Sequence, residues 1–281
     1  MKKSTLVKRM VLAAAAVAMS AVMLTGCGSE EAASDKKLLR VGMECAYAPF
    51  NWTQDAATTP DGTEAVKIYG SDFYAYGYDV AVAKKIADQM GYELEVHKVE
   101  WSSIGISMDA GDYDCIIAGM GRTAEREKSY SFTDPYYYRD NCIVVKKGSA
   151  YESVTGLSQL NGTGWIPLLD QVEGAVTGTN YETTSECFMA IMNDAADVCI
   201  VDVPTAKSAA LANDGLVIIE LDPADTFTGD DEMVNVCIAT RKDDTELRDA
   251  IQSAMNEIGW NDKAKMDELM DEVLTQQPAA N

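Results

Sequence analysis

Apolar and polar residues alternate along the chain in two rhythms, one typical of short strands and one typical of short helices. In the first half, each helical stretch stops at a glycine. The predicted elements there are the strands 38–43, 92–99 and 115–120 and the helices 80–90 and 104–110. Short strands and helices in turn favour an α/β protein with a largely parallel sheet.

The same alternation returns after residue 150, which predicts a second α/β unit. Its predicted elements are the helices 182–193 and 204–212 and the strands 198–201 and 216–221. The last segment, 246–274, has helical spacing throughout. Residues 54–76 are rich in Thr, Asp, Gly and Tyr and are typical of an inserted hairpin or loop. Two successive units suggest two lobes.

The N-terminus has the pattern of an export signal. A basic start precedes an unbroken run of apolar and small residues from Met10 to Met23. That run is shorter than the roughly 20 residues that span a bilayer, but it suits a signal peptide. It ends in Leu24-Thr25-Gly26-Cys27, which resembles the lipobox of bacterial lipoproteins. We expect residues 1–26 to be a signal peptide and 27–37 a tether lipidated at Cys27; an ordinary secretory signal is the alternative.

Net charge bears on the class of ligand, and cysteine content bears on disulfide bonds and metal sites. The net charge is −22, which disfavours nucleic acid, anionic lipid surfaces and polyanionic ligands. Six cysteines besides Cys27 invite a disulfide interpretation in an exported protein, yet four of them lie in apolar strand-like runs and are expected to be free buried thiols. Those four are Cys115, Cys142, Cys199 and Cys237, while Cys45 stays open. Neither the cysteine spacing nor the single His97 supports a zinc site, so no metal or cofactor is expected.

Six blocks, in order, carry a resemblance to a known family. They are 41–50, 76–80, 100–102, 111–136, 196–202 and 234–239. Together they resemble the amino-acid-binding branch of the type II periplasmic binding proteins, the extracellular solute-binding proteins of polar amino acid ABC importers. The resemblance implies two lobes with a ligand cleft between them and two hinge strands. The boundaries expected are 38–141 plus 231–281 for lobe 1, 147–224 for lobe 2, and hinges near 142–146 and 222–233.

The resemblance also implies which groups hold a free amino acid. Arg126 would grip the ligand carboxylate with its two-pronged guanidinium, although a solvated helix arginine is the alternative. Asp202 ends a strand and precedes a helix, so it can cap that helix and also bind the ligand ammonium. Gly119 would offer a carbonyl to the ammonium. Gly121 departs from the family pattern, in which a hydroxyl residue is usual, and leaves only its backbone amide.

Selectivity for the ligand side chain would come from Glu44, Tyr47 and Trp101. The two aromatic residues match positions that sandwich the ligand, with core packing as the alternative for Trp101. Glu44 suits an amide or a cationic side chain. The second lobe usually opens with a strand and a Gly-Thr turn, for which Thr163 is the candidate here, but the 156–165 segment is shorter than that pattern.

The implied function is that of a lipid-anchored, extracytoplasmic substrate-binding protein of an amino-acid ABC importer. It would capture a small polar amino acid, act as a monomer, contact the permease, and touch the membrane through the Cys27 lipid alone. A sensing module for a membrane receptor is one alternative, and a structural or adhesion lipoprotein is another. An exported prephenate-type dehydratase would need a general acid such as Glu44 or Glu100, and we expect no enzyme.

Overall fold

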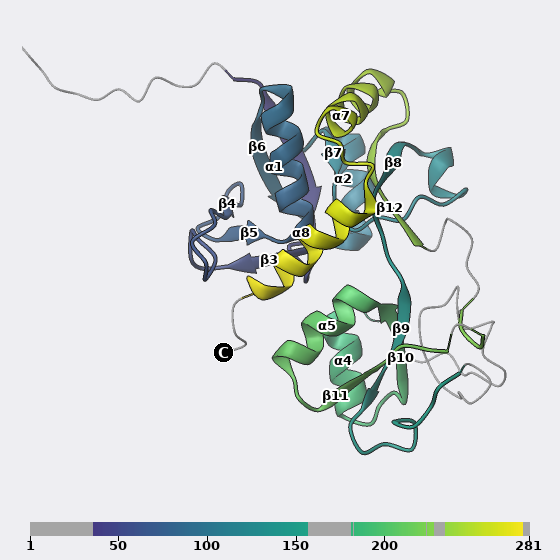
Figure 1. Cartoon of the computed structure of the whole chain (residues 1–281). Helices are drawn as coiled ribbons and strands as arrows, with labels where there is room; N and C mark the ends of the chain where they lie inside the picture. The colour runs from purple at the N-terminus through teal and green to yellow at the C-terminus, as the bar shows by residue number, and fades with distance from the viewer. Residues whose placement is uncertain (1–35, 157–180, 182, 223, 228–233, 278–281) are drawn as a thin grey trace, which may run out of the picture. The chain divides into compact units, whose positions relative to one another are not determined.

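Three β-sheets and the helices that cover them make up the part of the chain that the structure describes (Figure 1). This computed structural model describes residues 36–277 with the exception of 157–180, 182, 223 and 228–233. Among these residues, no helix combines the length and apolar character that crossing a bilayer requires.

The largest sheet has five strands in the order β6-β1-β7-β12-β8. Their bounds are β1 Leu38–Met43, β6 Glu93–Lys98, β7 Cys115–Ile116, β8 Tyr130–Tyr138 and β12 Asn235–Arg241. β1 runs parallel to β6 and β7, while β12 runs antiparallel to β7 and β8. The predicted parallel sheet is therefore only half parallel, because β12 does not enter through a βαβ crossover but returns from the second half of the chain.

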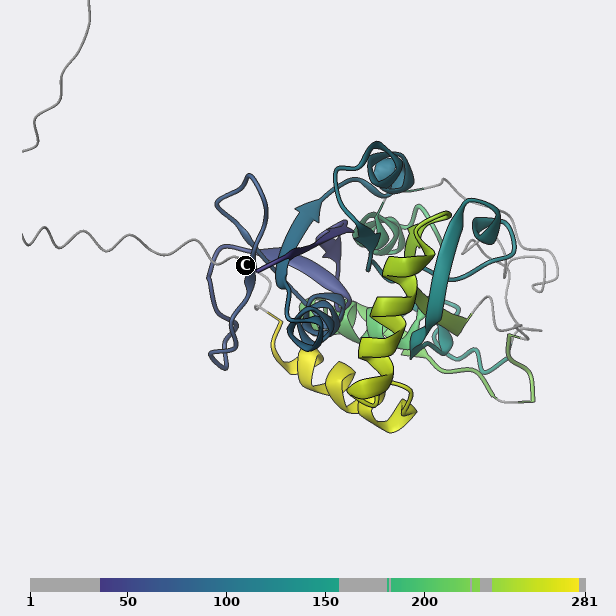
Figure 2. The same cartoon turned by 90° about the horizontal axis from the view of Figure 1, so that it is seen from above.

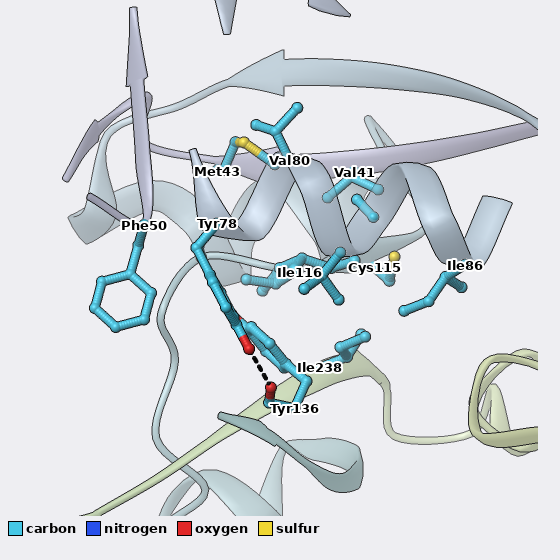
Figure 3. Close-up of a cluster of buried hydrophobic side chains, with 14 of the residues drawn as sticks. Val41, Met43, Phe50, Tyr78, Val80, Ile86, Cys115, Ile116, Tyr136 and Ile238 are labelled. Atoms are coloured by element: carbon cyan, nitrogen blue, oxygen red, sulfur yellow. Dashed lines mark hydrogen bonds between the residues drawn. The ribbon is translucent and has the colours of Figure 1, made fainter. Parts of the chain in front are cut away.

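Helices cover both faces of this sheet. α1 (Tyr78–Met90) and α7 (Thr245–Glu257) pack against each other on one face, with α8 (Lys263–Thr275) beside them. The shorter α2 (Ile104–Ala110) lies on the opposite face (Figure 2). In the core between them, Tyr78 donates a hydrogen bond to the carbonyl of Tyr136 at 2.9 Å (Figure 3). Strand and helix are thus joined by a polar contact inside an apolar cluster.

The segment 246–274, predicted to be helical, contains two helices with a break between them. α7 ends before Gly259, which adopts a left-handed φ of 69°. α8 then starts after Asp262, whose side chain accepts a hydrogen bond from the Ala264 amide. A left-handed glycine followed by an Asp cap is a usual stop and restart signal for helices.

The second sheet has three strands in the order β10-β9-β11, all paired antiparallel. Their bounds are β9 Asn141–Lys146, β10 Val198–Asp202 and β11 Leu216–Ile219. Successive side chains point to opposite faces and enter two separate apolar clusters. α4 (Thr184–Met192) and α5 (Val203–Ala212) supply Phe188, Ile191 and Ala206 to one of these clusters and so cover that face.

A small antiparallel sheet and two short turns complete the described elements. The sheet has the order β2-β3-β5-β4, and its strands are β2 Ala46–Tyr47, β3 Asn51–Gln54, β4 Val66–Lys67 and β5 Tyr74–Tyr76. The turns are the 3-10 helices η1 Trp101–Ser103 and η2 Arg126–Lys128. The insertion predicted over 54–76 is therefore a set of hairpins.

The lobe boundaries and hinges remain predictions. Residues 142–146, where one hinge is expected, lie inside β9, the central strand of the three-stranded sheet. The segment that joins β8 to β9 is Arg139 and Asp140. The second expected hinge, 222–233, falls largely outside the described residues.

Candidate functional site

The loop that follows β7 carries two of the predicted ligand contacts, Gly119 and Gly121. Both glycines are buried. Gly119 has a φ of 63°, and a Cβ placed on it would lie 2.6 Å from Cε1 of Tyr47. Both the left-handed backbone and the close ring exclude a side chain at this position. The loop therefore presents main chain, not a side chain, to the Tyr47 ring.

Arg126 opens η2 and directs its guanidinium back to this loop. Nη1 of Arg126 donates to the Gly121 carbonyl at 2.8 Å, and Cζ lies 5.3 Å from the centroid of the Trp101 ring. Burial, and secondly repulsion from Arg139, lowers the pKa of Arg126. Two predicted site residues, Arg126 and Trp101, are thus in contact, and a cation–π interaction with the indole orients the guanidinium.

Asp202 is the last residue of β10 and the N-cap of α5. Its Oδ1 accepts a hydrogen bond from the Thr205 amide at 2.9 Å, and 3% of its surface is exposed. The predicted cap is therefore confirmed. Its second oxygen, Oδ2, accepts a hydrogen bond from the Tyr47 hydroxyl at 2.7 Å. Burial and the neighbouring Asp202 charge raise the pKa of Tyr47, so the phenol keeps its proton and acts as the donor.

Tyr47 is the residue that links the predicted contacts. Its ring touches Gly119 and stacks on Phe50, with centroids 5.0 Å apart and an interplanar angle of 21°. Because its hydroxyl also binds Asp202, a continuous series of contacts runs from Asp202 through Tyr47 and the glycine loop to Arg126. Glu44 lies half-buried three residues before Tyr47, between β1 and β2.

A second arginine at this loop was not among the predicted site residues. Arg139, 6% exposed, follows β8 and donates from Nη1 to the Gly119 carbonyl at 3.4 Å. Its charge opposes the rise that burial causes in the pKa values of Tyr47 and Asp79, and it adds to the lowering of the pKa of Arg126, so all three lie within its electrostatic reach. In the sequence, Arg139 stands next to Asp140 between two strand-like runs, which is typical of an exposed loop. Nothing local marks it as buried.

A network of buried hydrogen bonds reaches the Gly119 amide. The fully buried Asp79 accepts hydrogen bonds from Asn51 Nδ2 at 2.7 Å and from the Tyr136 hydroxyl at 2.6 Å. The same Tyr136 hydroxyl accepts a hydrogen bond from the Gly119 amide at 3.1 Å. Burial raises the pKa of Asp79 to about 6, against the opposing effect of its hydrogen bonds. Asp79 thus positions the loop without reaching its open side.

The next residue of the loop is fixed from β12. Asn235 accepts a hydrogen bond from the Arg122 amide at 2.7 Å and donates one to the Arg122 carbonyl at 3.3 Å. The Arg122 side chain is exposed and pairs with Glu127 through Nε at 2.6 Å. Arg122 therefore contributes backbone to the framework of the loop, while its charge lies at the surface.

Two predicted site residues, Thr163 and Cys27, lie outside the described residues. Within the described part, no group of three or more His, Cys, Asp or Glu residues could hold a metal ion. A cavity of about 880 Å³ is lined by residues of several segments, among them Ala46, Ala48, Trp52, Phe188 and Thr205, but not by Arg126, Gly119 or Asp202. Its lining includes the chain neighbours of Tyr47 and the residue whose amide binds Asp202, so it adjoins part of the predicted site.

The chain matches the profile of the bacterial extracellular solute-binding proteins, family 3, over residues 39–272. It belongs to this family. A relative is the arginine-binding extracellular protein ArtP of Bacillus subtilis, 28% identical over 247 residues, or 85% of this chain and 88% of ArtP. The ABC transporter arginine-binding protein 1 of Escherichia coli is 25% identical over 79% of this chain and 86% of its own.

Solved structures confirm the fold of this family 3 protein. An amino acid ABC transporter substrate-binding protein of Streptococcus pneumoniae, bound to L-arginine, superposes with a TM-score of 0.69 at 22% identity, covering 86% of this chain and 95% of that one. An ancestral arginine-binding protein bound to arginine gives 0.63 at 27% identity, covering 85% and 97%. The expected α/β fold of the type II periplasmic binding proteins is therefore confirmed.

Proposed function

We propose that this chain is the substrate-binding protein of an amino-acid ABC importer and holds a free polar amino acid between Arg126 and Asp202. The observation that carries the proposal is the series of contacts joining these two groups through Tyr47 and the 119–121 loop. Membership of family 3 and relatives named for arginine binding support it.

The chemistry of the two groups matches a zwitterion. A guanidinium backed by Trp101 can bind a carboxylate with two parallel hydrogen bonds. A buried carboxylate with a lone pair still available can bind an ammonium, and each such charged hydrogen bond contributes about 1.5 to 3 kcal/mol. Asp202 is already oriented by the α5 amide of Thr205, so binding requires no rearrangement of the acid itself.

The ligand side chain is assigned to Glu44 and the Tyr47 face. Glu44 is an acceptor for a cationic or amide side chain, which agrees with the arginine named for two relatives. Arg139 donates to the Gly119 carbonyl, which is the group expected to accept a hydrogen bond from the ligand ammonium, so the ligand would share or displace this contact. We therefore rank arginine and other polar amino acids above apolar ones.

The test is a thermal unfolding screen of the chain from Ser29 onward against the common amino acids and cystine. A ligand at 100 times its dissociation constant adds about 2.7 kcal/mol of apparent stability. We expect a rise in Tm with a few polar amino acids only. No rise with any of them would remove the proposed function.

Matched variants separate site contacts from folding effects. Asp202→Asn keeps an oxygen for the Thr205 amide but removes the charge, and Arg126→Gln removes the guanidinium; each should raise Kd roughly 10- to 100-fold. Arg122→Gln is the control, because its side chain is exposed on the same loop. Equal losses in all three variants would show that the loop, not the charges, had been disturbed.

The lipid anchor, the lobes and the permease partner belong to the same proposal. Cys27 would carry the lipid, and the two sheets would be the cores of two lobes that close on the ligand. Metabolic labelling with a fatty acid should mark the wild type and not Cys27→Ala, which should appear in the soluble extracytoplasmic fraction. An unlabelled wild type would leave an ordinary secreted protein.

A further inference from the structure

Three cysteines gather on one face of the three-stranded sheet. Cys142 on β9 and Cys199 on β10 enter the same apolar cluster, and Cys187 of α4 packs against it. Their strand neighbours Ile143 and Ile200 point into the cluster on the opposite face. All three cysteines therefore lie in the layer between the sheet and α4.

Two of these thiols interact directly. Cys187 packs against the cluster that contains Cys199. The interaction of the two side chains lowers the pKa of Cys187 and, together with burial, raises that of Cys199. Cys187 lies in the first turn of α4, after the Thr183 cap, where the helix N-terminus also favours a thiolate. Cys187 is half-buried, whereas Cys142 and Cys199 are buried.

We propose that Cys187 and Cys199 form a disulfide bond once the protein has been exported. Neither cysteine forms a disulfide bond in the structure. An exported protein meets an oxidising environment, and a reactive, accessible thiol packed against a second thiol is the arrangement that such an environment oxidises. The proposal departs from the expectation that Cys199 is a free buried thiol.

The oxidant is a disulfide, either of a small thiol or of an exported thiol oxidase. The Cys187 thiolate attacks one sulfur of that disulfide and releases the first thiol. The Cys199 sulfur loses its proton, attacks the Cys187 sulfur of the mixed disulfide, and releases the second thiol. Two protein thiols lose two electrons and two protons, and the external disulfide gains them.

The bond would tie α4 to the strand that carries Asp202. Cys199 lies three residues before Asp202 on β10, so the covalent link would fix the strand near its functional end. Cys142 is the rival partner for Cys199, because Cys142 pairs with Val201 across the β9–β10 ladder, two residues from Cys199. Its complete burial keeps it from an external disulfide, and burial raises its pKa.

The test is differential alkylation of the full chain, exported with its own leader. Free thiols are labelled with light N-ethylmaleimide under denaturing conditions, the protein is reduced, and newly freed thiols take a heavy label. Peptide mass spectrometry should find heavy label on Cys187 and Cys199. The light label is expected on the remaining described cysteines, Cys45, Cys115, Cys142 and Cys237.

The control is Cys187→Ser, in which Cys199 should take the light label. Light label on both residues of the wild type would overturn the proposal, as would heavy label on Cys142 with Cys199 or on Cys187 alone. As a second readout, a reductant should lower the Tm of the wild type by roughly 5 to 10 °C and leave that of Cys187→Ser unchanged. An equal fall in both proteins would also contradict the bond.

Discussion

The two larger sheets of this family 3 protein differ in the apolar clusters around them and in the polar contacts of their buried carboxylates. The five-stranded sheet is part of one large apolar cluster and contains a fully buried polar network around Asp79. The three-stranded sheet separates two smaller clusters, and Asp202, the ligand contact proposed on it, is the N-cap of α5. The two buried carboxylates thus differ in their partners: Asp79 is bound by side chains of the core, whereas Asp202 is bound by one backbone amide and the Tyr47 hydroxyl.

The largest expected effect falls on the framework carboxylate. Asp79→Ala should lower the free energy of unfolding by about 3 to 5 kcal/mol, because it leaves the buried Tyr136 hydroxyl and the Asn51 amide without their acceptor. Denaturant unfolding measures it. A loss below 1 kcal/mol would mean that the two regions do not differ as described.

The same residue should give the protein a pH-dependent stability. The folded pKa of Asp79, about 6, lies above the usual value of 3.8, so the native state binds its proton more tightly than the unfolded state does. Stability from this group is present below pH 4 and is lost as pH rises through 6, on the order of 3 kcal/mol in total. Asp79→Asn, which does not titrate, should lack this component when both proteins are unfolded at pH 4 and pH 7.

In contrast to Asp79, Asp202 should affect ligand binding more than the free energy of unfolding. Asp202→Asn should raise the ligand Kd by roughly 10- to 100-fold, or about 1.5 to 3 kcal/mol. Its free energy of unfolding should change by less than about 1 kcal/mol, since asparagine also caps helices. Calorimetric titration and denaturant unfolding of the same sample separate the two effects. A variant that binds normally but unfolds early would place Asp202 in the framework.

The smallest effect belongs to the contact between the two regions. Tyr47→Phe keeps the ring beside Gly119 and Phe50 but removes the hydroxyl that binds Asp202. We expect a loss of about 1 kcal/mol in stability, the usual value of one hydrogen bond. Tyr76→Phe, at a buried tyrosine of the small sheet, is the comparison variant. Identical losses in both would assign no special role to the Tyr47 hydroxyl.

The local pattern of the sequence was enough for most elements. Residues 38–43 and 104–110 match β1 and α2 to the residue, because strand alternation and terminal glycines act locally. The strand predicted over 115–120 ends at Ile116 instead, since Gly119 turns the backbone into the left-handed region. Periodicity reports which residues are apolar, and it does not report where a buried chain leaves the sheet.

The resemblance to a known family predicts the candidate ligand contacts, but it does not predict the residues that hold those contacts in place. Arg126, Trp101, Tyr47 and Asp202 were named in advance, and the structure connects them. Arg139 and Asn235 could not be predicted as supports of the site, because their hydrogen-bond partners, Gly119 and Arg122, lie 20 and 113 residues away in the sequence. A polar residue whose partner is distant in the chain looks like any surface residue until the fold brings the two together.

The hydrogen bond from Tyr47 to Asp202 has a kinetic consequence. In the proposed site, the Asp202 carboxylate already accepts a hydrogen bond from the Tyr47 hydroxyl. A ligand ammonium would therefore replace this donor instead of bulk water, and exchange of donors, not dehydration, would be the slow step. When a ligand bound as proposed leaves, the Tyr47 hydroxyl would donate to the Asp202 carboxylate again. A binding protein that passes its ligand to a permease would benefit, because competition from the Tyr47 hydroxyl would speed ligand release while it limits ligand affinity.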